Sequence, residues 1–387
     1  LNVDDLPATG SSMLSFKDLV DQLISDVAFQ TTTTSIIPTY AVAYSCPQRN
    51  FILGELYMWK ATLQQENEIA SATPDSLKTS KSFYQTAAGY YKAIIQNDGS
   101  LSANTDMYKL STLFGGTSWS TIFSYTRSNT ALSNEVLWMI NFDENSGNYN
   151  NLKKLFSNTS GDYKLKPSDY VINLWNTQKL STGKIGDYRG QNGSWASVSG
   201  VPVVQKYLYN KTQFSDNAEV YLARASMVYL RYAEAVNRCG KPMLALTALK
   251  YGLNKTNMLN YVPTAEKTPS AGFINFDDVR YDFSKGVRGR ALIEPSTLIV
   301  PNFKWDATNP AKSKNDSINY VEDAILQEYA LETAFEGNRW ADCMRVAIRR
   351  DNSGEYMYSL LAQKQSNANV ADKLKVKTNW YLPFPEK

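Results

Sequence analysis

Residues 187–195 bring together, within nine positions, the side-chain types that carbohydrate binding requires. Sugar rings are bound by flat aromatic faces, which cover the axial C–H groups of a pyranose, and by planar amide or guanidinium groups, which pair with hydroxyls. This glycine-rich segment offers Tyr188 and Trp195 for stacking, and Arg189 and Asn192 for hydrogen bonding. The alternative is an ordinary loop in which Trp195 packs at the edge of the core and Arg189 pairs with Asp187. We expect a carbohydrate-binding site here.

Two further tryptophans are candidates for stacking on a sugar. Trp119 closely follows a pair of glycines, and Trp175 lies in a stretch flanked by asparagines. The alternative for each is ordinary packing, since large aromatic rings are mostly well buried. Trp59, Trp138 and Trp340 lie on stretches with an amphipathic pattern, and we expect them in the core.

The composition excludes several kinds of catalytic and metal site. The chain has no histidine, so no His-containing metal site, Ser–His–Asp triad or Cys–His dyad can form. Its three cysteines lie far apart and include no C-x-x-C pair, which excludes a disulfide framework and a zinc knuckle. A net charge of +3 gives no reason to expect a nucleic acid or an anionic membrane as partner. We expect no catalytic residue, no metal and no cofactor.

Acidic side chains leave one catalytic alternative open. Glycoside hydrolysis needs two carboxylates about 5 to 9.5 Å apart across a cleft. Adjacent acids occur at 143–144, 277–278 and 322–323, but none has a recognisable catalytic context. Arg339, Asp342 and Arg345 lie three residues apart on one helix face, and we interpret them as a structural ion-pair network.

Helices must position these residues, because apolar side chains recur at helical spacing along much of the chain. The spacing predicts helices over residues 16–29, 49–65, 80–96, 218–239, 242–253 and 318–348, the last with a break at Gly337. Gly240 followed by Pro242 is a strong turn signal between two helices and is typical of a tetratricopeptide-like pair. The predicted fold class is all-α, with tetratricopeptide-like helix pairs, long irregular loops and minor β-structure, including a strand within residues 135–142.

We predict a single domain over residues 1–387. Its scaffold consists of helix pairs at about 15–100 and 205–260 and of C-terminal helices at 318–350. Variable loops at about 100–205 and 261–315 are expected to bind the ligand. Loops of this length are usually functional or disordered, and their aromatic content argues against disorder.

Three stretches resemble motifs of the SusD/RagB family. Residues 227–240 read MVYLRYAEAVNRCG and, with Ala245-Leu246, resemble the signature helix pair R-x-A-E-x-Y-L-x-x-A-E-A-x-N-x-x-G, then A-L. Residues 328–345 read EYALETAFEGNRWADCMR and resemble the C-terminal motif E-x-x-x-E-x-x-x-E-G-x-R-W-x-D-x-x-R, which is the most specific of the three. Residues 380–385 read WYLPFP and are similar to the closing L-P-I-P. The resemblance covers about residues 15–100, 130–145 and 205–387.

The resemblance implies a SusD-like outer-membrane lipoprotein that lacks catalysis and serves nutrient uptake and polysaccharide utilisation. Family members bind a glycan or another nutrient and cover the mouth of a TonB-dependent SusC-like porin. We therefore expect a surface-exposed location at the outer membrane, through a lipid anchor that this chain does not contain. The family's usual N-terminal portion is expected to be missing or much reduced.

The predicted function is non-catalytic binding of an oligosaccharide or polysaccharide at the cell surface and its delivery to a SusC-like transporter. A helical-repeat protein–protein scaffold or a peptide-binding receptor is the alternative, because stacked helix pairs usually present concave partner surfaces. A glycoside hydrolase is the least favoured of the three.

Overall fold

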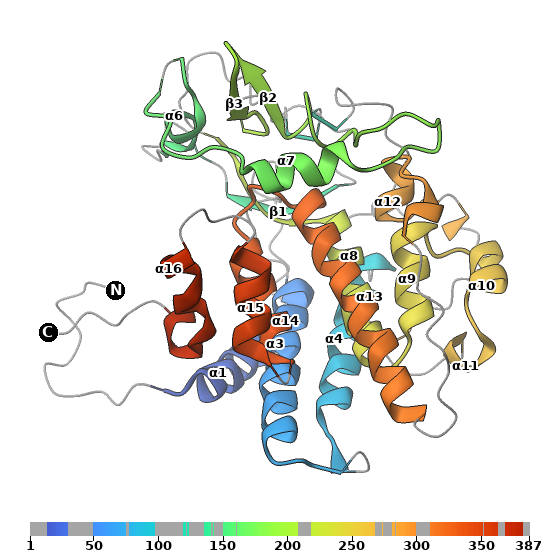
Figure 1. The fold of residues 1–387 in the computed structure, drawn as a ribbon. Helices are drawn as coiled ribbons and strands as arrows, with labels where there is room; N and C mark the ends of the chain where they lie inside the picture. The colour runs from blue at the N-terminus through green and yellow to red at the C-terminus, as the bar shows by residue number, and fades with distance from the viewer. Residues whose placement is uncertain are drawn as a thin grey trace, which may run out of the picture.

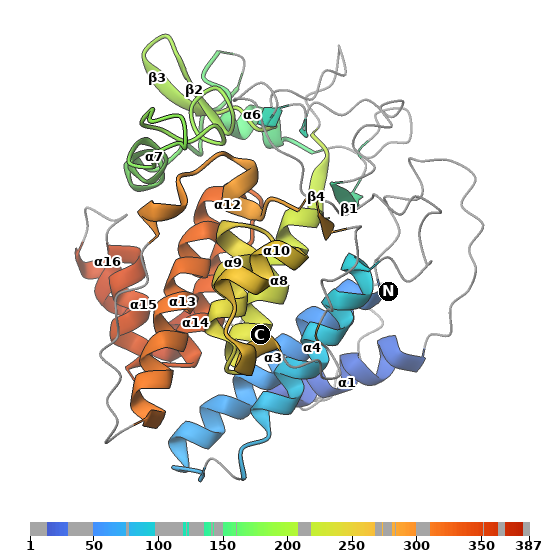
Figure 2. The same ribbon diagram turned by 90° about the vertical axis from the view of Figure 1, so that its right-hand side faces the viewer.

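The structure is a computed structural model that describes residues 14–29, 49–74, 77–96, 119–120, 122–123, 135–140, 142, 150–159, 161–207, 218–267, 273, 281–282, 284–298, 310–350, 352–362 and 368–381. These residues are mostly helical, as predicted. The long helices pack side by side beneath a layer of loops and short elements (Figure 1). The same two layers are visible when the molecule is turned by 90° (Figure 2).

The N-terminal helices are α1 (Phe16–Phe29), α3 (Arg49–Ala70) and α4 (Ser80–Ile95), which confirms the three predicted segments. Helices α3 and α4 approach closely at Gly54, where an added Cβ would lie 2.6 Å from the Tyr91 ring. The Glu68 carboxylate, near the end of α3, accepts hydrogen bonds from the backbone N–H groups of Thr79 (2.7 Å) and Ser80 (2.9 Å). Because the first N–H groups of a helix lack partners within it, this carboxylate caps α4.

A second pair consists of α8 (Ala225–Arg238) and α9 (Pro242–Lys250). Gly240 joins them with a φ of +82°, a conformation that a residue without Cβ adopts at little cost. Its N–H donates to the Asn237 carbonyl and the Lys241 N–H to the Val236 carbonyl, the two bonds of a Schellman motif. The predicted glycine stop and the following helix are confirmed.

The prediction that this helix begins at residue 218 is wrong. Residues Val220–Arg224 form strand β4, which pairs antiparallel with β1 (Val136–Ile140), and α8 starts only at Ala225. Strand β1 lies within the segment predicted to be extended. The strand conformation of β4 depends on a partner strand 80 or more residues away, which a local helical pattern cannot reveal.

The long C-terminal helical segment divides into α13 (Pro310–Glu332) and α14 (Arg339–Ile348). The predicted break is confirmed, since Gly337 lies between them with a φ of +85°. The chain then continues through α15 (Ser353–Ala362), α16 (Ala368–Asp372) and the 3-10 helices η7 (Lys373–Lys375) and η8 (Lys377–Trp380).

The layer above the helices consists of short elements and connecting loops (Figure 1). Strands β2 (Trp195–Val198) and β3 (Val201–Val204) form a hairpin whose turn residues, Ser199 and Gly200, both have positive φ, as a type I′ turn requires. The shorter elements in this layer and along the α9 side of the scaffold are α6 (Leu152–Phe156), α7 (Asp169–Asn176), β2 (Trp195–Val198), β3 (Val201–Val204), α10 (Lys255–Tyr261), α11 (Thr264–Lys267), α12 (Val287–Arg290) and η6 (Pro295–Thr297).

The main hydrophobic core lies between α3, α4, α8, α9, α13 and α14. Trp59 and Trp138 pack against it with partly buried rings, as expected. The expectation for Trp340 is wrong: its side chain is 44% exposed, and its Nε1–H donates to the Trp380 carbonyl at 3.2 Å. In the described part of the chain, no helix combines the length and the apolar character needed to cross a membrane.

Candidate functional site

The predicted sugar-binding loop is compact and hydrogen-bonded to itself. Within residues 187–195, the Gly190 N–H donates to the Asp187 carbonyl (3.0 Å) and the Ser194 N–H to the Arg189 carbonyl (2.9 Å). Asn192 turns the chain with a φ of +60°, and its N–H donates to the Trp195 carbonyl at 2.7 Å. These bonds give the segment a defined shape before any ligand is present.

Glycines let this loop pack tightly against two of the predicted tryptophans. A Cβ at Gly190 would lie 2.7 Å from the Trp175 Cβ, and one at Gly193 would lie 2.8 Å from the Trp119 Cδ1. The Trp119 Nε1–H also donates to the Ser194 hydroxyl at 3.0 Å. Trp195 shares a small core cluster with Trp175. The structure therefore brings the three candidate tryptophans together around one loop, although they are 20 or more positions apart in sequence.

The exposure of these side chains differs sharply. Trp119 and Trp175 are 0% exposed and Trp195 is 8% exposed, so no indole presents an open face for stacking. Tyr188 is partly exposed, and Asn192 is exposed. Sugar binding through the tryptophans stays a prediction, and it would require them to turn out of the packed interior.

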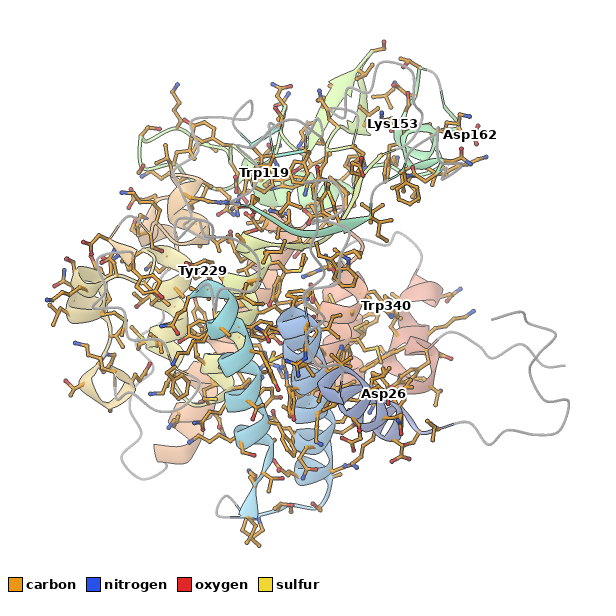
Figure 3. The ribbon with its side chains drawn as sticks, turned by 180° about the vertical axis from the view of Figure 1, so that it is seen from behind. Asp26, Trp119, Lys153, Asp162, Tyr229 and Trp340 are labelled. Carbon is orange, nitrogen blue, oxygen red and sulfur yellow. The ribbon has the colours of Figure 1, made fainter. Side chains whose placement is uncertain are left out.

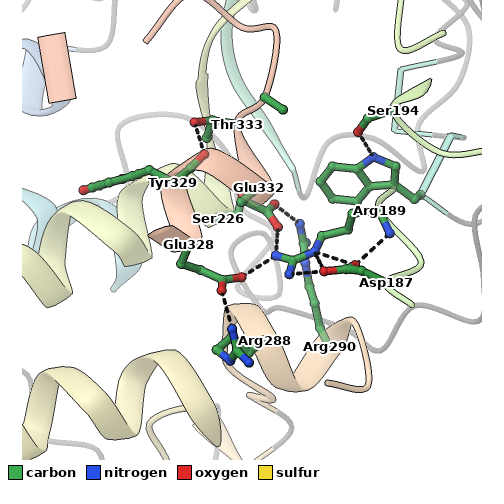
Figure 4. Close-up of polar contacts among 12 residues, drawn as sticks. Asp187, Arg189, Ser194, Ser226, Arg288, Arg290, Glu328, Tyr329, Glu332 and Thr333 are labelled. Atoms are coloured by element: carbon green, nitrogen blue, oxygen red, sulfur yellow. Dashed lines mark hydrogen bonds and ion pairs between the residues drawn. The ribbon is translucent and has the colours of Figure 1, made fainter. Parts of the chain in front are cut away.

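Arg189 is fully buried and its guanidinium is surrounded by carboxylates (Figure 4). Nε and Nη2 bond to Asp187, the shortest contact being 2.7 Å, and Nη1 bonds to Glu328 and, at 2.9 Å, to Glu332. Burial by itself lowers the pKa of Arg189, but Asp187 and Glu328 outweigh it and hold that pKa well above the ordinary value. The direct bond from Arg189 to a sugar hydroxyl that the sequence analysis expects is not tested by this arrangement, and it would require one of these ion pairs to break.

Arg189 belongs to a larger network centred on three acids of the α13 end. Glu328, Glu332 and Glu336, which we call the carboxylate row, are spaced four residues apart along α13 and the turn that follows it. They are buried and form ion pairs with cations from the loop layer, β4 and α12, namely Arg189, Lys206, Arg224, Arg288 and Arg290. Two further acids pair with the same cations: Asp187 with Arg189, and Glu135 with Arg224 and Arg290. The five acids balance the five cations, which a buried cluster requires, because an unpaired buried charge is very costly.

Side chains of the neighbouring segments also bind the C-terminal end of α13 and the turn that follows it. The Lys206 ammonium donates to the Ala334 carbonyl (2.8 Å), and the Tyr207 hydroxyl donates to the Phe335 carbonyl (2.7 Å). Arg224 donates to the Glu332 carbonyl at 3.0 Å. Carbonyls at a helix C-terminus have no partner within the helix, and cations are favoured there. The loop layer is thus fastened to the scaffold through one helix end.

A second network binds the scaffold helices to one another. Glu234 of α8 accepts two bonds from Arg345 of α14 at 2.9 Å, and Asp342 lies 3.0 Å from Arg345 and 2.7 Å from Arg231. The predicted structural role of Asp342 and Arg345 is confirmed. Arg339 differs from the prediction, since its Nη1 donates to a backbone carbonyl of α13 at 2.7 Å.

The sequence analysis missed the cations that face the carboxylate row. Lys206, Arg224, Arg288 and Arg290 are buried in the structure, and none was among the candidate site residues. The available signal was the row itself, because three acids at four-residue spacing on a buried helix face need partners of opposite charge. Among the described residues, no group of three or more acidic or cysteine side chains is placed so that it could hold a metal ion. The acids at 143–144 and 277–278 lie outside the described residues.

The family model of the SusD family matches residues 65–387. The chain belongs to the SusD family. No curated protein matches it.

The solved structures that resemble this SusD family member share little sequence with it. Bacteroides fragilis NanU is 13% identical, with a TM-score of 0.45, over 90% of this chain and 64% of its own. A SusD superfamily protein from Parabacteroides distasonis is 16% identical, with a TM-score of 0.41, over 81% of this chain and 56% of its own. Another from Bacteroides fragilis is 15% identical, with a TM-score of 0.46, over 90% of this chain and 70% of its own. The chain thus spans less than two thirds of the first two proteins.

The structure gives the SusD-like motifs of this chain a physical meaning. The acids matched by the C-terminal motif, Glu328, Glu332 and Glu336, form the carboxylate row, and the matched Asp342 and Arg345 belong to the second network. Figure 3 shows the side chains of the described residues on both layers, with Trp119 labelled in the upper one. The charged motif residues therefore assemble the fold rather than lie on its surface.

Proposed function

We propose that this chain binds an oligosaccharide or polysaccharide at the cell surface and delivers it, without cleaving it, to a TonB-dependent SusC-like transporter. The observation that carries the proposal is the match of the SusD family model over residues 65–387, together with the motifs quoted above. Because the chain spans only 64% and 56% of the first two similar structures, the activity, substrate and partner of the whole protein are part of the proposal.

The proposed contact surface is the exposed side of residues 187–195. Tyr188 offers a partly exposed ring, and Asn192 an exposed amide, on a loop whose backbone is closed by its own hydrogen bonds. A ring and a planar amide on one rigid loop are suited to a sugar that presents C–H groups and hydroxyls. Trp195 lies at the boundary of this surface with 8% of its side chain exposed.

The test is a titration of the purified protein against soluble α-glucans, β-glucans, xylans, mannans and pectins, with released reducing ends measured in the same samples. Binding without release supports the proposal and identifies the substrate class. Release of reducing ends would make the protein a glycoside hydrolase and overturn the proposal. No binding to any member of the panel would count against a glycan and favour the peptide or protein ligand.

Variants of the loop then locate the contact. Tyr188→Ala is expected to weaken binding about tenfold, or ~1.4 kcal/mol, which is the size of one aromatic contact. Asn192→Gly is expected to lower the affinity by a similar factor, since it removes a hydrogen-bonding amide while glycine accepts the φ of +60° at this position. Tyr261→Ala is the matched control, because Tyr261 is 40% exposed on α10, outside the loop layer. Equal affinities for all three variants and the wild type would remove residues 187–195 from the site.

The proposed location is the outer surface of the outer membrane, held there by a lipid anchor. Protease treatment of intact cells that produce the full-length protein tests it. Degradation without cell lysis is the expected result, and protection until lysis would contradict it.

A further inference from the structure

The loop that carries Tyr188 and Asn192 is bound to the scaffold through Arg189. This side chain lies in sequence between the partly exposed Tyr188 and the exposed Asn192, but it points inward, to the carboxylate row (Figure 4). We propose that Arg189 is a positioning residue for the ligand-binding loop: it fixes residues 187–195 on α13 and does not contact the ligand itself. The inference rests on the proposed function, since it concerns the same site.

Each of the three nitrogens of the Arg189 guanidinium already bonds to a carboxylate. Nε lies 3.0 Å and Nη2 lies 2.7 Å from the two oxygens of Asp187, while Nη1 bonds to Glu328 and to Glu332 (2.9 Å). All three nitrogens are thus engaged, and the side chain is 0% exposed. A planar guanidinium can join two carboxylate partners at a fixed angle, which an ammonium cannot do.

The carboxylates on the two sides of the Arg189 guanidinium, which we call the Arg189 fork, belong to different layers of the molecule. Asp187 is in the loop itself, two residues before Arg189, whereas Glu328 and Glu332 are on α13, 139 and 143 residues away. The fork therefore fixes the position of the loop relative to the scaffold. The remaining cations of the network, such as Arg290 and Arg224, still neutralise Glu332 when Arg189 is absent.

Hydrogen bonds within the loop connect Arg189 to the residues on its exposed side. The Arg189 carbonyl accepts the Ser194 N–H at 2.9 Å, and the Ser194 hydroxyl accepts the Trp119 indole N–H at 3.0 Å. Tyr188 is the direct neighbour of Arg189, and Asn192 lies inside the turn that the Arg189–Ser194 bond closes. A shift of Arg189 therefore moves both predicted ligand contacts. If the loop is not held in place before binding, it must become ordered when the ligand binds, and the free-energy cost of this ordering lowers the affinity.

Hydrogen exchange without ligand tests the positioning directly. Arg189→Met keeps an unbranched side chain that reaches about as far as Nε and removes the charged guanidinium, and Glu328→Gln removes the charge of one of its carboxylate partners without altering the loop sequence. In both variants we expect the exchange of the amides of residues 189–195 to accelerate at least tenfold more than that of the amides of α3 and α8, whose exchange follows the stability of the whole fold. Arg350→Met is the matched control, because Arg350 also pairs with acids of α13, Glu322 (3.1 Å) and Asp323 (2.6 Å), but outside the loop network.

The affinity of each variant for the tightest-binding polysaccharide of the panel distinguishes a positioning role of Arg189 from direct contact with the ligand. A positioning role predicts weaker binding in both Arg189→Met and Glu328→Gln and wild-type binding in Arg350→Met. Loss of binding in Arg189→Met with wild-type binding in Glu328→Gln would overturn the inference and make Arg189 a ligand contact. Unchanged exchange in residues 189–195 of Arg189→Met would also overturn it. If Arg189→Met does not fold, Arg189→Lys, which keeps the charge but not the planar fork, replaces it in both measurements with the same criteria.

The two proposals fail in different ways. If no polysaccharide binds the wild type, the proposed function fails, while the exchange measurement on the ligand-free protein still decides whether Arg189 fixes the loop.

Discussion

The carboxylate row predicts that replacement of Glu332 by glutamine will be strongly destabilising. Glu332 is 0% exposed, and its two carboxylate oxygens lie 2.8 Å from Arg290, 3.3 Å from Arg224 and 2.9 Å from Arg189. Glutamine retains one acceptor oxygen but turns an N–H donor toward guanidinium groups that are themselves donors. It also leaves five buried cations facing four acids.

The magnitude follows from the burial of the group. Removal of one partner from a buried ion pair typically costs about 3–5 kcal/mol, because the remaining charge is left without compensation. We expect Glu332→Gln to lower the free energy of unfolding by this amount. Glu355→Gln is the control, since the Glu355 side chain is 63% exposed and lies 3.7 Å from Lys375; exposed pairs of this kind contribute about 0–1 kcal/mol.

The assay is urea unfolding followed by tryptophan fluorescence and by circular dichroism, at several pH values. Burial by itself raises the pKa of Glu332, but Arg290, Arg189 and Arg224 hold that pKa well below its ordinary value of 4.5. A carboxylate with a lowered pKa in the folded state stabilises the fold above its unfolded-state pKa, and this contribution is lost as the pH falls through the folded-state pKa. The difference between wild type and Glu332→Gln should therefore be constant near neutral pH and should shrink below about pH 4.5. A destabilisation no larger than that of Glu355→Gln would refute the argument that the row holds the two layers together.

Two further predictions concern helix packing and capping. Gly252→Ala should cost about 2–4 kcal/mol in unfolding free energy, because Gly252 has a φ of +82° and its added Cβ would lie 2.5 Å from the Gly286 nitrogen. Gly183→Ala, with a similar φ of +85° and nothing within 4 Å, should cost only about 1 kcal/mol, so equal losses in urea unfolding would refute the packing argument. Glu68→Gln should cost about 1 kcal/mol at neutral pH through the loss of the charged cap of α4. Although burial raises the pKa of Glu68, hydrogen bonds from Ser80 and Thr79 lower it below 4.5 overall, so this loss should diminish as the pH falls below 4.5; a pH-independent loss would contradict the capping role.

Much of the helical scaffold was predictable, because helix periodicity is local. Segment 16–29 matches α1, the predicted break falls at Gly337, and Gly240 ends α8 as the pattern indicated. The start of α8 was not predictable, because residues 220–224 take their strand conformation from pairing with β1. Trp340 shows the same limit for burial: an amphipathic stretch indicates which face is apolar, but not whether another element covers every ring on it.

The sequence proposed the candidate site but did not determine its geometry. The sequence identified residues 187–195 and the tryptophans that the structure assembles around them. It left open whether Arg189 faces a ligand or Asp187, and the structure directs it to Asp187 and the carboxylate row. Exposure depends on packing between segments, and no pattern within nine residues contains that information.

The sequence by itself determined the helical scaffold, the absence of imidazole chemistry and membership of the SusD family, because each of these depends on residue types or on spacing within a short segment. Only the tertiary structure decided which charged residues pair and which aromatic faces are covered. Arg189 and Glu332 are 143 residues apart, and Arg224 and Glu336 are 112 apart. Such pairs form only when separate helices and loops pack together. A buried charge is stable only if an opposite charge lies beside it in space, however far apart the two residues are in sequence.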